Sequence, residues 1–155
     1  MTPAINSAKR AKVKFDIHEY QHNPAAASYG MEAATELGVD PRRVFKTLVV
    51  ALDNRDLAVA VLPVSTQLDL KRFARAVGSK KVAMAERSAV ERTTGYVLGG
   101  VSPVGQRKKL RTVIDTSASQ FNTVYVSAGR RGLEIELSSS DLCSLTGGEF
   151  KAISK

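Results

Sequence analysis

The chain has little cysteine and histidine: one cysteine, Cys143, and two histidines, His18 and His22, among 155 residues. A lone cysteine cannot form an intramolecular disulfide, which is typical of a reducing compartment, and we expect Cys143 to be a buried, unreactive thiol. Two histidines with no third ligand at a useful spacing predict neither a metal site nor any other cofactor. They also fit no hydrolase triad, and the G-x-S-x-G pattern is absent. If the chain is an enzyme, it works without a conventional protein nucleophile.

Long apolar runs are lacking as well. No stretch approaches the ~20 apolar residues that a membrane helix needs. The segment Met1–Asn6 lacks the charged-then-apolar order of a signal peptide. Repeats, low-complexity tracts and linkers are missing too. We therefore expect residues 1–155 to form one domain in the cytosol.

Positive charge is in excess, with 23 Lys and Arg against 15 Asp and Glu and a net charge of +8. Such an excess attracts polyanions and steers their approach, and nucleic acid is the commonest such partner. An acidic membrane surface is the rival, but the chain has no long amphipathic basic helix and no lipidation signal. Charge that only confers solubility is the third reading.

The order of apolar segments and turn residues predicts a mixed α/β fold, with helices packed outside a largely antiparallel, barrel-like sheet. Residues 44–52 and 57–63 are nearly continuous apolar runs, typical of strands covered on both faces, and their short polar link indicates a hairpin. Further strands are expected at residues 14–20, 82–84, 113–115, 124–127 and 133–137. Helices are expected at residues 2–13, 28–37, 69–78 and 86–92, followed by a last short helix. The expected N-caps are Thr2, Ser28, Asp69 and, for the last helix, Asp141.

Lys46 is the most informative residue, because it is a charge within an apolar strand. Strand alternation places it on the same face as Leu48 and Val50. Lysine is seldom fully buried. Either its stem reaches an edge of the sheet, or its ammonium lies in a pocket as a ligand for an anion or a carbonyl. Thr47 points to the opposite face, where its hydroxyl could be no more than a β-forming side chain.

A glycine-rich loop and a basic run follow each other directly. In Gly99-Gly100-Val101-Ser102-Pro103, successive N–H groups could form a nest for an anion or an oxyanion, although a plain turn is an equal reading. The loop lacks the Gly-Lys-Ser/Thr ending of a Walker loop. The run at residues 106–111 could bind phosphates or be a solvated turn, and its adjacency to the loop favours phosphates. Its cations are Arg107, Lys108, Lys109 and Arg111.

Tyr20 and Tyr29 flank a turn at Asn23-Pro24. Either ring could stack on a base or a sugar, and packing is the ordinary alternative.

Four segments carry a resemblance to a known family: Phe45-Lys46-Thr47, Gly99-Gly100-Val101-Ser102-Pro103, Tyr125-Val126-Ser127 and Arg131-Gly132-Leu133-Glu134-Ile135-Glu136-Leu137. In these segments the chain resembles the bacterial YbaK-type trans-editing deacylases. These are relatives of the editing domain inserted in bacterial prolyl-tRNA synthetases. Gln67-Leu68-Asp69-Leu70-Lys71 and Thr94-Gly95-Tyr96 add to the likeness, which extends from Thr2 to the last helix. The motifs are specific when taken together.

The resemblance implies removal of cysteine mistakenly attached to tRNA(Pro), and also to tRNA(Cys), beside prolyl-tRNA synthetase and without a metal. It implies that the substrate's own thiol attacks its ester. It assigns catalysis to Lys46, Gly99 and Gly100. Substrate contacts are assigned to Tyr20, Tyr29, Thr47, Pro103 and Ser127. Glu134 stands where the family has aspartate, so the carboxylate is on a longer arm.

Two other functions fit the same residues. One is a deacylase of the same fold for another mischarged tRNA, such as Ala-tRNA(Pro). The other is a non-catalytic RNA-binding module, for which the net charge and the run at residues 106–111 would suffice.

Overall fold

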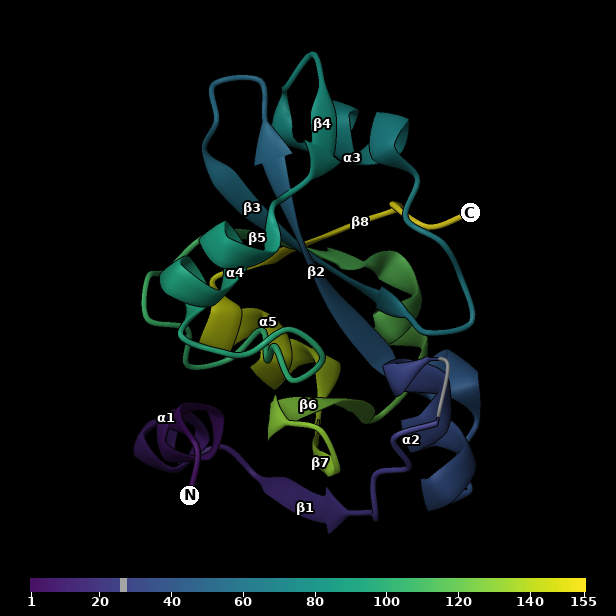
Figure 1. The fold of residues 1–155 in the computed structure, drawn as a ribbon. Helices are drawn as coiled ribbons and strands as arrows, with labels where there is room; N and C mark the ends of the chain where they lie inside the picture. Colours follow the sequence, from purple (N-terminus) through teal and green to yellow (C-terminus); the bar gives the residue numbers. More distant parts are fainter. Residues whose placement is uncertain (26–27) are drawn as a thin grey trace.

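The computed structural model describes residues 1–25 and 28–155 and has two β-sheets with helices packed around them (Figure 1). The small sheet has the strand order β1–β7–β6, and the large sheet has the order β4–β2–β3–β5–β8. The strands are β1 (Phe15–Glu19), β2 (Phe45–Leu52), β3 (Leu57–Pro63), β4 (Val82–Met84), β5 (Arg111–Asp115), β6 (Val124–Arg130), β7 (Leu133–Leu137) and β8 (Glu149–Lys151).

The first three helices begin at the side-chain caps that the sequence predicts, whereas the helix at Arg87–Thr94 has no side-chain cap hydrogen bond within the residues that the structure describes. The hydroxyls of Thr2 and Ser28 and the carboxylate of Asp69 each accept a first-turn N–H, as expected. The last helix is capped by Ser138 and not by Asp141, whose own N–H donates to the Ser138 hydroxyl. The helices are α1 (Pro3–Ala11), α2 (Tyr29–Leu37), α3 (Leu70–Val77), α4 (Arg87–Thr94) and α5 (Ser139–Thr146), with 3-10 turns η1 (Pro41–Arg43) and η2 (Thr116–Gln120).

The predicted hairpin of β2 and β3 forms the centre of the large sheet, in a register that pairs Phe45 with Pro63. Both faces of this hairpin are buried, which confirms the reading of its apolar runs. One face packs into the main core between the sheets, and the other packs against Phe73 of α3. β5 joins β3 in parallel, and β8 joins β5 in parallel. Those two pairings and β8 itself were not predicted.

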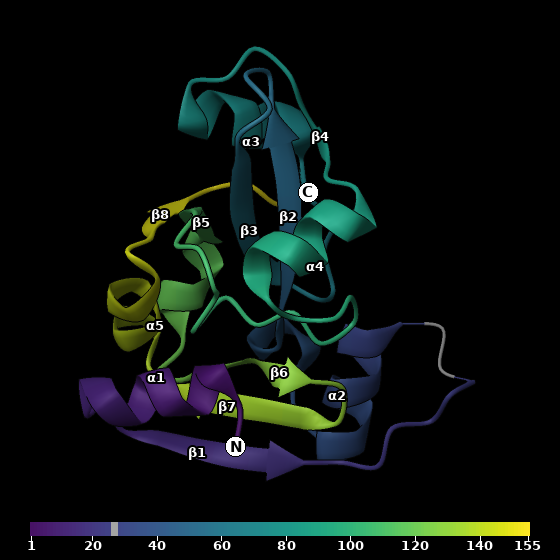
Figure 2. The same cartoon turned by 60° about the vertical axis from the view of Figure 1, so that its left-hand side comes forward.

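The sheets face each other across the main core, and the mixed α/β class is confirmed. They do not close into a barrel: an isolated bridge between Val44 and Tyr125 is the pairing that links them. Figure 2 shows α3 at one end of the molecule, beyond the large sheet, and α1 with the small sheet at the other. Within residues 1–25 and 28–155, no helix has the length and apolar character needed to span a membrane.

Helix α2 packs where the two sheets meet. Its Ala33 and Ala34 are buried against Val44, Val64 and Tyr125. This packing places the first turn of α2 beside the start of β2. A cavity lies there.

Candidate functional site

A cavity of about 310 Å³ opens between the start of β2, the start of α2, the loop that follows α4, and the turn between β6 and β7. This volume is at the lower end of the range for small-molecule pockets. Its walls come from five separate segments of the chain. They are lined by Tyr20, Ser28, Tyr29, Gly30, Phe45, Lys46, Thr47, Leu48, Leu98, Gly99, Val101, Ser127, Arg130, Arg131 and Glu134.

Lys46 is half-buried in this wall, on the β2 face that it shares with Leu48 and Val50. Its Nζ donates a 2.6 Å hydrogen bond to the carbonyl oxygen of Thr66. In the described part of the chain, no carboxylate lies within ion-pair distance of it. Burial lowers the pKa of Lys46. An ammonium has three donors, so two remain for a ligand in the cavity.

Glu134 is the buried acid of the site, with 6% of its surface exposed. Desolvation raises its pKa from 4.5 to about 8, so the carboxyl group is mostly protonated at neutral pH. It lies opposite His18 and Ser127 on the neighbouring strands of the small sheet. A protonated carboxyl group can donate a hydrogen bond, which a carboxylate cannot.

Two of the hydroxyl-bearing residues that line the cavity, Thr47 and Ser127, come from different sheets. The Oγ1 of Thr47 is buried and, among described residues, has no hydrogen-bond partner. A buried unpaired hydroxyl costs stability unless a ligand or water satisfies it. The Ser127 hydroxyl, by contrast, already accepts the N–H of Gly129. Thr47 is therefore a buried hydroxyl at the cavity that a substrate could satisfy.

Arg131 and Tyr29 form a stack over one side of the cavity, with the guanidinium carbon 3.7 Å from the centre of the ring. The Nε and Nη2 atoms of Arg131 are buried and have no partner within the described residues. These two nitrogens form one edge of the guanidinium, the edge that grips a phosphate or carboxylate in a bidentate manner. Arg131 was assigned no role in the site from the sequence, because its partner Tyr29 lies far away in the chain.

The loop after α4 is fixed at both ends. The Tyr96 hydroxyl donates to the carbonyl of Val104, and the Leu98 N–H donates to the Glu91 carboxylate. Burial raises the pKa of Tyr96 to about 12, so it stays a donor at physiological pH. Gly99 has φ +95°, and a methyl group there would lie 2.9 Å from the Tyr29 ring. Only glycine fits this position without displacing the stack.

The loop offers N–H donors to the cavity, and of the two that were predicted, Gly99 and Gly100, only Gly99 is among them. The Gly100 N–H is used in a turn, where it donates to the carbonyl of Val97, and Gly100 does not line the cavity. Gly99 and Val101 do line it, and their N–H groups have no acceptor in the part of the chain described. Assigning an oxyanion donor to Gly100 was therefore wrong, because turn geometry already uses that donor.

Pro103 and the basic run lie elsewhere. Pro103 lines a second cavity, between α1 and α5, and not the one that holds Lys46. None of the four cations at residues 107–111 lines the main cavity either. Arg107 donates to the carbonyl of Arg92, and Arg111 donates to the carbonyls of Ala76 and Val77 and pairs with Glu149. Closeness in sequence to the glycine loop did not bring these charges into the site.

The histidines have structural partners instead. His22 contacts Glu32 at 2.9 Å, and Glu32 also accepts the N–H of Asn23. Burial acts to raise the pKa of Glu32, but these hydrogen bonds outweigh it and the pKa is lowered. His18 contacts Glu136 at 2.9 Å. No set of three or more His, Cys, Asp or Glu side chains suited to a metal ion occurs in residues 1–25 and 28–155.

Comparison with known proteins agrees with this arrangement. The profile of the aminoacyl-tRNA editing domain family matches residues 23–145, which hold nearly every residue of the cavity. The chain belongs to this family, so aminoacyl-tRNA editing is the class of function that the fold and the site define. The resemblance drawn from the sequence is confirmed at this level.

Individual relatives show how similar the chain is to particular proteins. A protein of Enterococcus faecalis with the provisional name Cys-tRNA(Pro)/Cys-tRNA(Cys) deacylase EbsC is 39% identical over 152 residues, covering 98% of this chain and 92% of the relative. A proline–tRNA ligase of Citrifermentans bemidjiense is 34% identical over 97 residues, which is 63% of this chain and 17% of the ligase. A crystal structure provisionally described as a trans-editing enzyme for prolyl-tRNA synthetase shares the fold, with a TM-score of 0.82, 24% identity, and coverage of 98% and 92%.

Proposed function

We propose that this protein is a trans-editing deacylase that releases cysteine from Cys-tRNA(Pro), and that its substrate ester is held in the cavity around Lys46. The observation that carries this proposal is Lys46 itself, a half-buried ammonium with no carboxylate partner in the described chain. Such a group suits an anionic or carbonyl oxygen. The name of the Enterococcus faecalis relative supports cysteine as the amino acid.

The residues favour catalysis by positioning rather than by a protein nucleophile. In the proposed step, the thiolate of the substrate cysteine attacks the ester carbonyl carbon. A C–S bond forms, the bond to the ribose oxygen breaks, and that oxygen takes a proton. The products are free tRNA and a strained thiolactone, which water then opens. A thiol of pKa ~8.5 is a few per cent thiolate at neutral pH and is strongly nucleophilic.

Each side chain has a role within this scheme. Lys46 holds an oxygen of the ester or of the terminal ribose in the reactive pose. The N–H groups of Gly99 and Val101 face the charge that develops on the carbonyl oxygen. The protonated carboxyl group of Glu134 and the unpaired hydroxyl of Thr47 hydrogen-bond the substrate's polar groups.

A deacylation assay on Cys-, Ala- and Ser-tRNA(Pro), together with Cys-tRNA(Cys), tests the proposal. We expect release of cysteine at least about 100-fold faster than release of serine, because the two side chains differ little in shape and only the thiol can cyclise readily. Efficient release of serine would instead indicate an activated water, and preferential release of alanine would indicate the other deacylase. If no ester is cleaved, the RNA-binding reading replaces this one.

Association with prolyl-tRNA synthetase is part of the proposal. The cavity has room for little more than the acylated end of a tRNA, so identity of the tRNA has to be read elsewhere. The likeness to a segment of a proline–tRNA ligase supports this partner. Co-sedimentation of the purified pair, with and without tRNA(Pro), tests it, and separate sedimentation under both conditions would contradict it.

A further inference from the structure

The body of a tRNA has to lie outside the cavity, so some surface next to it must face phosphates. The run at residues 107–111 was the candidate from sequence, but it does not line the cavity. A second set of cations, which shares only Arg111 with that run, begins near Lys46 and continues along α3. We call it the α3–β8 basic surface, defined by Arg72, Arg75, Arg111, Lys151 and Lys155.

The surface is joined to the cavity through the loop that leads into α3. The carbonyl of Thr66 accepts the Lys46 ammonium, and the next residue, Gln67, forms two backbone hydrogen bonds with Lys155, at 2.8 and 3.1 Å. Figure 1 shows the C-terminal segment crossing this loop. The exposed Lys155 is therefore connected to the Lys46 ammonium through two contacts, one between Lys155 and Gln67 and one between Thr66 and Lys46.

From there the cations continue along one face of α3. Arg72 donates to the carbonyl of Ser154, and a shallow hollow beside it is lined by Arg72, Arg75 and Lys151. Arg111 closes the far end of α3 by donating to the carbonyls of Ala76 and Val77. These contacts fix the backbone that carries the charges.

The charge on this surface is only partly neutralised. Asp69 pairs with Arg72 and Glu149 pairs with Arg111, while Arg75, Lys151 and Lys155 have no ion-pair partner in the described chain. All three are exposed. Clustered unpaired cations lower stability by mutual repulsion and raise affinity for a polyanion.

We infer that the α3–β8 basic surface binds the phosphate backbone of the acceptor arm while the acylated 3′ end occupies the cavity. This inference rests on the proposed function, because it takes an acylated tRNA as the substrate. The partner is the duplex of the acceptor arm, since cations from α3, β5, β8 and the C-terminal segment can contact its phosphates without reading sequence.

The variant Arg75→Glu/Lys151→Glu tests the inference against a matched control, Lys9→Glu/Lys14→Glu. The control changes the net charge equally at exposed residues in and just after α1, at the opposite end of the molecule (Figure 2). The assay compares Cys-tRNA(Pro) with a short substrate, a trinucleotide CCA carrying 3′-cysteine.

For Cys-tRNA(Pro), we expect kcat/KM of the α3–β8 variant to fall about tenfold or more, mainly through KM, and the salt dependence to become shallower. The control should fall less than about twofold, and neither variant should change turnover of the short substrate. A neutral pair, Arg75→Gln/Lys151→Gln, should give an intermediate loss, and matched thermal unfolding shows that each variant is folded.

Equal losses in variant and control, or equal losses on both substrates, would overturn the inference and leave the deacylase intact. A wild-type protein that cleaves neither substrate would instead overturn the proposed function. Unchanged kcat/KM of the α3–β8 variant on tRNA, with an active wild type, counts against the surface alone.

Discussion

In the proposed function Lys46 binds a substrate oxygen, and its surroundings suit that role. Its strand neighbours remove water, its one hydrogen bond to Thr66 fixes the head group, and no carboxylate in the described chain competes for it. We expect Lys46→Ala to lower kcat for Cys-tRNA(Pro) deacylation by about 100-fold or more, since positioned donors typically contribute that much. Single-turnover rates at saturating enzyme measure this directly.

The matched variant for this position is Lys46→Arg, which keeps the charge but not the compact ammonium. It should recover little activity, because a planar guanidinium does not fit the same hydrogen bond to Thr66. Both variants should unfold within a few degrees of the wild type. Wild-type turnover by Lys46→Ala would remove Lys46 from the mechanism.

The protonation of Glu134 makes the stability of the folded protein depend on pH. Its pKa is raised to about 8 in the folded protein and is near 4.5 when exposed. The folded state therefore holds the extra proton between these values, so this residue's contribution is complete below about pH 4.5 and is lost as pH rises through 8. We expect Glu134→Gln to remove that loss and to be more stable than the wild type at pH 9. Urea unfolding at pH 5, 7 and 9 tests it, and parallel curves for the two proteins would contradict it.

Among the elements, the loop after α4 is the most constrained. At Gly99 a methyl group would meet the Tyr29 ring at 2.9 Å and Arg131 Cδ at 3.3 Å, on a backbone with φ +95°. We expect Gly99→Ala to cost about 1–3 kcal/mol of stability and to lower kcat/KM by displacing the Tyr29–Arg131 stack. Gly78→Ala is a control for backbone strain alone, because φ is +72° there and nothing lies within 4 Å. If both variants affect activity alike, the stack plays no part.

The C-terminal segment is held by a buried carboxylate on β5. Oδ1 of Asp115 accepts the N–H groups of Ile153 and Ser154, and Oδ2 accepts from Ser117. Burial acts to raise the pKa of Asp115, but these bonds outweigh it and the pKa is lowered from 3.8. Its contribution is thus present above about pH 4 and is lost as pH falls through the folded-state pKa.

We expect Asp115→Ala to lower the free energy of unfolding by about 2–4 kcal/mol at pH 7, because it leaves four donors without their acceptor: the N–H groups of Ser117, Ile153 and Ser154 and the Ser117 hydroxyl. The difference from the wild type should shrink at pH 3. Chemical denaturation at the two pH values measures both effects, and an equal difference at both would show that the charge is not what matters.

Short sequence patterns were enough to predict most of the helices and strands and half of the candidate site. N-caps such as Thr2 and Asp69 act within one helical turn. The apolar runs at residues 44–52 and 57–63 indicate directly that both faces of these strands are buried. β8 could not be predicted, because three residues show no alternation and its partner β5 lies more than thirty residues earlier. Ser138 and Asp141 are equally good caps by type, so only the fold selects between them.

At the scale of the whole molecule, the effect of the excess positive charge on substrate binding depends on where the charges lie. A prediction from the α3–β8 basic surface is that kcat/KM on Cys-tRNA(Pro) falls on the order of 10- to 100-fold between 50 and 200 mM salt, as expected for a few phosphate contacts. The value of kcat should change little. Initial rates over a salt series measure this, and the CCA substrate serves as the control. If kcat/KM did not change with salt concentration, the positive charge would affect only solubility.

Closeness in sequence did not predict the site correctly where the fold brings distant segments together. Lys46, Thr47, Tyr20, Tyr29, Gly99, Ser127 and Glu134 were predicted as site residues, and the structure places all of them in one cavity. Arg131 was missed as a cavity residue because its significance depends on Tyr29, about a hundred residues earlier. Arg107 was included because it follows the glycine loop, but the chain turns away there.

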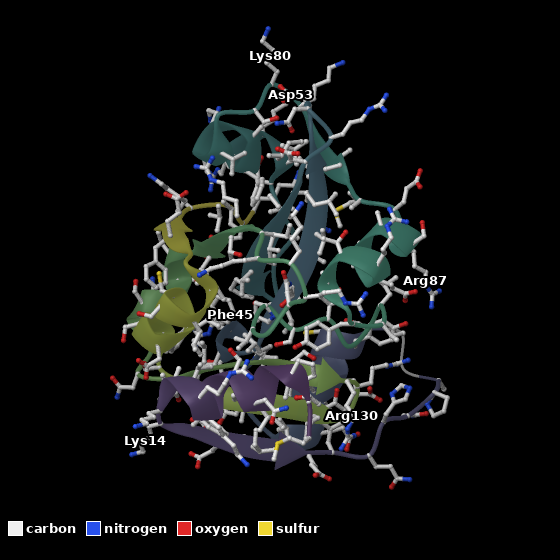
Figure 3. All side chains as sticks on the ribbon, turned by 90° about the vertical axis from the view of Figure 1, so that its left-hand side faces the viewer. Lys14, Phe45, Asp53, Lys80, Arg87 and Arg130 are labelled. Carbon is white, nitrogen blue, oxygen red and sulfur yellow. The ribbon has the colours of Figure 1, made fainter. Side chains whose placement is uncertain are left out.

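One contact ties two distant segments into a single wall. A methyl group at Gly100 would lie 2.7 Å from the Cα of Arg130, so the loop after α4 packs backbone to backbone on the turn between β6 and β7 (Figure 3 labels Arg130). Neither segment can lengthen or shorten without breaking that contact. In an alignment of relatives, insertions and deletions in the two segments should therefore occur together, a covariation that the local sequence of neither segment would reveal.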